Sequence, residues 1–107
     1  MTESEFLTHT DQVFRHLQDQ LDASGLDLEV LWSGNVLEIE CPDGSKIVVN
    51  RHVPNQELWI AARSGGYHFA WRQNEWLNTR DGGEFYATLS ECLCNQTGEE
   101  CGLHKSV

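Results

Sequence analysis

The chain has 107 residues, which is enough for one domain with a single hydrophobic core and too few for a second. Its 17 acidic and 7 basic residues give a formal charge of −10, and this balance argues against nucleic acids and anionic membrane surfaces as partners. Because residues 1–5 lack the features of a signal peptide and no run of about 18 apolar residues occurs, we expect a soluble, cytoplasmic protein.

The first predicted element is an amphipathic helix over residues 4–23. Ser4 is its expected N-cap, and Glu3 and Glu5 lie at the positive end of the helix dipole. Asp11, Asp19 and Asp22 are expected on the solvent-exposed side. The residues expected to face the core follow the three-four spacing of one buried stripe, namely Phe6, Thr10, Val13, Phe14, Leu17 and Leu21.

The middle of the chain is a series of short runs in which apolar and polar residues alternate, separated by turn residues such as Gly34, Gly44 and Gly65. These runs predict about six antiparallel strands, near residues 27–32, 36–41, 46–51, 58–61, 67–71 and 75–78. A second helix is predicted over residues 84–95. From Gln96 onward the sequence is polar, and we expect a flexible tail.

Helix, about six antiparallel strands and helix, in this order, predict one α+β domain over residues 1–107. In this two-layer sandwich both helices pack on one face of the sheet, and the other face is exposed to solvent. Alternation places Trp59 and His68 together on the exposed face. An uncovered tryptophan is a functional hint, and a loop or a terminal segment that covers Trp59 is the alternative interpretation.

Signals of enzymatic chemistry are absent from the sequence, and we predict no catalytic residues. No Ser or Cys lies in a Gly-x-Ser-x-Gly turn, and Gly65-Gly66 joins two strands instead of opening a helix. His9 and His16 are about 10 Å apart along a helix at seven residues' spacing, too far to share one metal ion, and are expected at the surface. Three cysteines near the C-terminus are interpreted as ordinary thiols, namely Cys92, Cys94 and Cys101.

The strongest candidate is a cluster of carboxylates at the end of the first helix. Asp19 and Asp22 lie where the helix dipole is unfavourable for negative charge, and Asp27 and Glu29 continue the cluster onto the first strand. A local rule that is broken repeatedly at one place indicates a functional site. Oxygen ligands on a convex surface would bind hard cations weakly and exchangeably. A solvated helix face without any metal is the alternative.

Several motifs together resemble the bacterial frataxins of the CyaY type. The resemblance extends from Ser4 to about Leu93 and includes Asn50, Pro54 and Trp76 together with Leu58-Trp59-Ile60-Ala61 and Gly65-Gly66-Tyr67-His68-Phe69. It implies a two-helix, six-strand sandwich that binds ferrous or ferric iron weakly. It also implies a regulator of iron–sulfur cluster assembly, or an iron donor to it, that binds a cysteine desulfurase, with the scaffold protein nearby.

By position, the resemblance implies that iron is bound by Asp11, Asp19, Asp22, Asp27 and Glu29. It implies that Asp19 and Asp22 also contact the desulfurase, and that the exposed sheet face contacts partners through Asn50, Trp59 and His68. A monomer is expected without iron. The open alternative is a structural interaction module whose acidity serves only solubility and partner docking.

Overall fold

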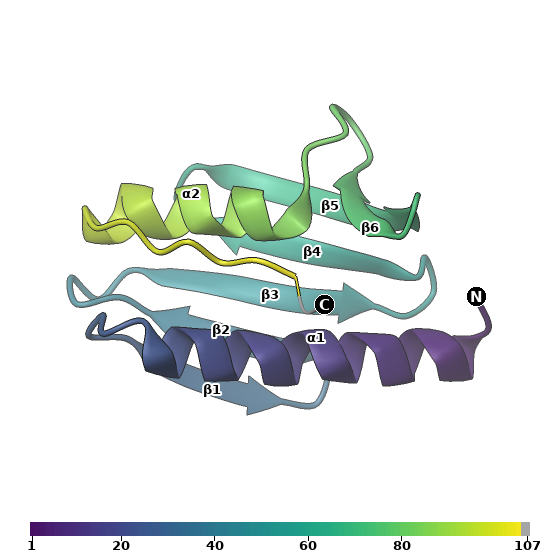
Figure 1. Cartoon of the computed structure of the whole chain (residues 1–107), viewed down its shortest axis with the longest axis horizontal. Helices are drawn as coiled ribbons and strands as arrows, with labels where there is room; N and C mark the ends of the chain where they lie inside the picture. Colours follow the sequence, from purple (N-terminus) through teal and green to yellow (C-terminus); the bar gives the residue numbers. More distant parts are fainter. Residues whose placement is uncertain (106–107) are drawn as a thin grey trace.

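The computed structural model describes residues 1–105 as one helix, six strands and a second helix. Helices α1 (Glu3–Ala23) and α2 (Phe85–Thr97) lie side by side on the same face of the sheet (Figure 1). All six strands pair antiparallel in sequential order, β1 (Glu29–Ser33), β2 (Val36–Glu40), β3 (Lys46–His52), β4 (Glu57–Ala62), β5 (Gly65–Arg72) and β6 (Glu75–Asn78). The predicted two-layer α+β sandwich is therefore confirmed.

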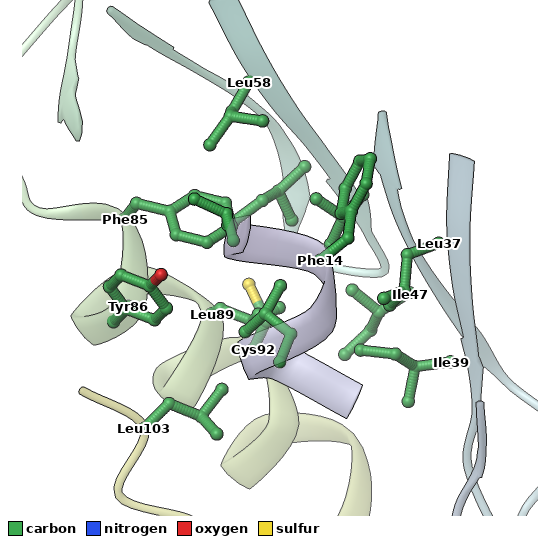
Figure 2. Packing of buried hydrophobic residues seen from close by; sticks show 14 of the residues in the cluster. Phe14, Leu37, Ile39, Ile47, Leu58, Phe85, Tyr86, Leu89, Cys92 and Leu103 are labelled. Carbon is green, nitrogen blue, oxygen red and sulfur yellow. The ribbon is translucent and has the colours of Figure 1, made fainter. Parts of the chain in front are cut away.

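The hydrophobic core fills the space between the two helices and the sheet. Phe14 of α1 faces Leu37 and Ile47 of the sheet, and Leu89 of α2 lies beside them (Figure 2). The side chains of all four are 0% exposed. Fully burying an apolar side chain of this size contributes about 1.5–3 kcal/mol. This burial holds both helices against one face and leaves the other face of the sheet exposed.

Helix α1 begins one residue earlier than predicted, and its N-cap is a different residue. Thr2, not Ser4, is the N-cap, and its side chain accepts a hydrogen bond from the amide of Glu5. The carboxylate of Glu5 accepts in return from the amide of Thr2, at 2.9 Å, which completes a capping box. The predicted N-cap was wrong because this reciprocal pair satisfies two amides, whereas Ser4 lies inside the helix.

Several strand ends differ from the prediction by one or two residues. β1 begins at Glu29 instead of residue 27, because the amide of Leu28 bonds back to the carbonyl of Leu26 in the preceding loop. β3 continues one residue further, to His52, which pairs with Glu57 of β4. The other apolar faces agree with the predicted alternation, since Phe69 is buried and Trp71 packs against the core.

The C-terminal segment is packed on the protein, so the predicted boundary at Gln96 is wrong. Gln96 is buried within α2, and its side-chain oxygen accepts from the amide of Arg63 at 2.9 Å. The helix ends at Thr97 and is capped by Gly98, whose φ of 75° favours glycine. Beyond it, the chain runs between α1 and α2 (Figure 1) and buries Cys101 and Leu103. No helix within residues 1–105 is both long and apolar enough to cross a membrane.

Candidate functional site

An acidic ridge, defined as Asp19, Asp22, Asp27 and Glu29, lies at the junction of α1 and β1, and all four residues are exposed. A tight connection brings the end of the helix to the start of the strand. The Ser24 hydroxyl donates to the carbonyl of Leu21 at 2.7 Å and accepts from the amide of Leu26 at 3.2 Å. Because Ser24 caps the helix end, the ridge carboxylates are not needed to satisfy backbone groups there.

The electrostatics of the ridge are unfavourable by themselves. The last turn of α1 carries no basic residue, and among residues 1–105 none of the four carboxylates forms an ion pair. Carboxylates near a helix C-terminus face the negative end of the dipole. Within the same part of the chain, no three His, Cys, Asp or Glu side chains come close enough to hold a metal ion together. The ridge therefore offers dispersed negative charge instead of a preformed cage.

Asp11 was predicted with the ridge, but its carboxylate is bound to the guanidinium of Arg51. Arg51 is a largely buried cation, with 10% of its side chain exposed. It also donates to the Thr10 hydroxyl at 3.1 Å and to Asn35 Oδ1 at 2.9 Å, and it lies 5.6 Å from the ring centre of Phe14. Asp11 thus belongs to a link between α1, the β1–β2 turn and β3.

The exposed face of the sheet carries an aromatic ladder, defined as His52, Trp59 and His68. These residues come from the neighbouring strands β3, β4 and β5, and Trp59 is directly opposite His68. The His52 and Trp59 rings are 4.1 Å apart at 7°, and the Trp59 and His68 rings are 4.2 Å apart at 10°. The prediction that Trp59 and His68 share the outer face is therefore confirmed, and neighbouring side chains cover the indole.

The orientation of Trp59 is fixed by its own strand. Its indole Nε1 donates to Glu57 Oε1 at 2.8 Å, two residues earlier on β4. Asn50 pairs with Trp59 across β3 and β4, as the shared outer face predicted. Three small or branched apolar residues surround this row on the same face, Val48, Ala61 and Ala70. Asn50, Trp59 and His68 thus form one continuous surface.

Sequence reasoning missed His52 and Arg51. His52 has the same parity as Asn50, and alternation would have placed it on the outer face, but the strand was predicted to end at Arg51. Arg51 has the inward parity of Val49, where a charged residue was itself a signal of a buried partner. The partner of Arg51, Asp11, lies 40 positions earlier in the sequence, so only the three-dimensional structure identifies that pair.

His9 was predicted at the surface, but it is half-buried at the edge of a groove. It packs against Trp71 and Trp76, with ring centres 4.4 Å and 5.6 Å away, and burial lowers its pKa. Its Nδ1 and the indole nitrogen of Trp76 are buried without a hydrogen-bond partner among the described residues. The side chains line a groove of about 560 Å³ between α1, the β5–β6 hairpin and the start of α2.

The remaining predicted candidates are at different places in the fold. His16 binds the tail, because its Nε2 lies 3.0 Å from the carbonyl of His104. Cys92 and Cys101 are buried and Cys94 is exposed. Burial raises the pKa of the Cys92 and Cys101 thiols. These features fit thiols that are protected by packing.

Comparisons with known proteins agree on one family. A family model for the frataxin-like domain matches residues 1–99. The iron–sulfur cluster assembly protein CyaY of Neisseria meningitidis serogroup B is 56% identical over 99 residues, covering 92% of each chain. The protein of the same name from Chromobacterium violaceum is 54% identical, covering 92% of this chain and 94% of that one.

Solved structures show the same fold. A frataxin from Psychromonas ingrahamii superposes with a TM-score of 0.91 at 28% identity, over 98% of this chain and 100% of that chain. A trimeric frataxin from Saccharomyces cerevisiae, complexed with ferrous iron, gives a TM-score of 0.68 at 24% identity, over 92% of this chain and 88% of that chain.

Proposed function

Because the chain belongs to the frataxin-like family, we propose that it acts in iron–sulfur cluster assembly as a non-enzymatic regulator that binds iron weakly. Relatives at 54–56% identity carry the name of iron–sulfur cluster assembly proteins. The observation on which the proposal depends most is the acidic ridge, where four exposed carboxylates lie without a cationic partner in the described chain.

Iron would be a cargo or signal at the ridge instead of a resident cofactor. Carboxylate oxygens suit hard cations, and an exposed convex site leaves much of the hydration shell in place, which favours weak and exchangeable binding. We assign this role to Asp19, Asp22, Asp27 and Glu29. Asp11 contributes less, because binding a cation there requires it to leave Arg51.

Partner binding would use two surfaces. The ridge attracts a basic surface of a cysteine desulfurase through Asp19 and Asp22, and electrostatic steering of this kind raises the rate of association. The exposed sheet face, through Asn50, Trp59 and His68, contacts the same assembly, which includes the scaffold protein. Tryptophan in a partly buried, oriented position is typical of residues that dominate interface energy.

Two-dimensional NMR under anaerobic conditions and low salt tests iron binding at the ridge. Ferrous ion should broaden amide signals locally between Asp19 and Glu29. The double change Asp19→Asn with Asp22→Asn should reduce this effect, whereas Glu91→Gln with Glu100→Gln removes the same charge from exposed positions elsewhere and should leave it intact. Small, uniform shifts over the whole protein would instead favour the module whose acidity serves solubility and docking alone.

The effect on cluster assembly is measured separately. Cysteine desulfurase and scaffold protein are reconstituted with and without this protein, and the rate of cluster formation is followed by absorbance. We expect a change in rate that depends on the ridge carboxylates. An unchanged rate at saturating protein would contradict the regulatory role even if iron binds.

A further inference from the structure

The rings of the aromatic ladder stand on the sheet with their edges toward solvent. Neighbouring strands are about 4.8 Å apart, so rings on adjacent strands can stack face to face when the stack runs perpendicular to the strands. The spacings of 4.1 Å and 4.2 Å between ring centres and the small interplanar angles match this arrangement. One face of the Trp59 indole is therefore covered by His52 and the other by His68.

This cover limits what the indole can offer to another molecule. Stacking of an aromatic ring, and cation–π contact with a guanidinium or ammonium group, both require an open ring face. The indole nitrogen is also occupied, because it donates to Glu57 Oε1 at 2.8 Å. What remains accessible of half-buried Trp59 is its carbon edge.

We propose that Trp59 contacts its partner through this edge, and that His52 is the positioning residue that fixes the indole for this contact. The inference rests on the proposed docking at the sheet face and specifies its chemistry. His68 contributes from the opposite side, and Glu57 holds the nitrogen end. The indole is thereby ordered before binding, which lowers the entropy cost of immobilising a side chain at an interface.

The surroundings of the edge indicate which partner chemistry fits. Aromatic edges carry partial positive charge and favour contact with oxygen acceptors. Val48, Ala61 and Ala70 make a low apolar floor on the same face. Asn50 adds an amide beside Trp59. These features suit an extended partner segment that presents backbone carbonyl groups and small apolar side chains, rather than one that inserts a stacked arginine or aromatic ring.

A set of substitutions tests the proposal against a reconstituted desulfurase–scaffold complex by isothermal titration calorimetry. Trp59→Ala removes the indole and tests the docking itself. His52→Ala uncovers one ring face, and His52→Phe restores a stacked ring without imidazole nitrogens. Glu57→Gln keeps an oxygen acceptor for the indole and controls for charge. Melting temperatures of all variants are recorded, so that a folding defect is not mistaken for weaker binding.

We expect Trp59→Ala to weaken binding most and His52→Ala to weaken it by about two- to tenfold, the range for loss of one aromatic pair. His52→Phe should return binding to near the parent value. The indole N–H resonance of Trp59 should shift in His52→Ala and move back toward the parent position in His52→Phe. A purely structural role of His52 would lower stability without this pattern of rescue.

The results separate failure of the inference from failure of the proposed docking. If Trp59→Ala weakens binding while His52→Ala strengthens it, the partner uses the ring face, and edge presentation is wrong. If Trp59→Ala weakens binding while His52→Ala leaves it unchanged, His52 does not position the indole. If His52→Phe binds as weakly as His52→Ala, the imidazole nitrogens are needed, of which Nδ1 accepts from the amide of Asn55 at 3.3 Å, and positioning of Trp59 by ring stacking alone is wrong. If Trp59→Ala binds like the parent, the sheet face is not the docking surface, and the inference fails together with that part of the proposed function.

Discussion

Replacing Arg51 with leucine should destabilise the protein strongly, although Arg51 has no part in the proposed ridge or ladder. The guanidinium joins three segments that are distant in sequence, because it binds Asp11 and Thr10 of α1 and Asn35 of the β1–β2 turn from its position on β3. Leucine keeps an apolar stem near Phe14 but provides no donor. The substitution therefore removes the polar link while preserving much of the packing.

The magnitude follows from the burial of the two partners. Breaking a buried ion pair by removing one member costs about 3–5 kcal/mol. Here the Arg51 side chain is 10% exposed but that of Asp11 is 43% exposed, so Asp11 can be solvated again after the change. We therefore expect the lower end, about 3 kcal/mol. For a domain of this size, such a loss lowers the melting temperature by about 12 °C or more.

A double-mutant cycle measures the contribution of the pair. Circular dichroism melts of Arg51→Leu, Asp11→Asn and the double variant give the coupling energy. Asp11→Asn alone should cost about 1–3 kcal/mol, because it leaves the largely buried guanidinium of Arg51 without its counter-charge, although an amide oxygen can still accept from it. In the Arg51→Leu background it should cost nothing, because the carboxylate has no cation left to bind. A melting temperature of Arg51→Leu within about 2 °C of the parent, corresponding to less than 1 kcal/mol, would refute this reasoning.

Four further predictions concern the ridge, partner binding and α1. Asp19→Asn with Asp22→Asn should raise the melting temperature modestly while weakening iron and desulfurase binding. Each carboxylate is destabilised by the helix dipole and by repulsion from the other carboxylate, and each effect costs a few tenths of a kcal/mol. A lower melting temperature with unchanged iron binding would make these residues structural. Affinity for the desulfurase should fall steeply as salt is added, because the Debye length is only about 10 Å at 0.1 M. Stopped-flow measurements should show that salt acts mainly on the association rate. A salt-independent affinity would exclude the ridge as the docking surface. Burial lowers the pKa of His9, so the unfolded state binds a proton at higher pH than the folded state does, and stability should be lost as pH falls below about 6.5. Urea titrations at pH 7 and pH 5 should show a smaller loss of stability in His9→Gln than in the parent protein. An identical loss of stability would contradict this. Thr2→Ala should cost about 1 kcal/mol by removing the N-cap, whereas Ser4→Ala should stay within about 0.5 kcal/mol; equal thermal shifts would contradict the assignment of the cap.

The sequence predicted the parts of the fold that depend on periodic patterns. The three-four spacing from Phe6 to Leu21 matches the buried face of α1, and alternation through Leu58 and Ile60 matches the inward face of β4. Turn glycines separate the strands correctly, for example Gly34 with its positive φ of 58°. These patterns are local, because each follows from the geometry of a single element and its one buried face.

Features that depend on distant partners could not be predicted. Gln96 looked like the start of a polar tail, but its amide donates to Ser45 Oγ, 51 positions earlier, at 2.9 Å. His9 looked exposed on a helical wheel because the two tryptophans that cover it come from the β5–β6 hairpin. The fifth predicted iron ligand, Asp11, carries the same charge as the others in the sequence, and only its contact with Arg51 distinguishes it.

The four cysteines provide a natural set of probes for how the protein opens. Cys94 is exposed, so a thiol reagent should modify it in the native state. All three remaining cysteines are buried in the hydrophobic cluster, Cys101 in the C-terminal segment, Cys41 just after the end of β2 and Cys92 within α2. Labelling of Cys101 therefore reports detachment of the C-terminal segment, and labelling of Cys92 reports separation of α2 from the sheet. Mass spectrometry of a labelling time course can read both free energies of opening from the wild-type chain, without any added reporter group.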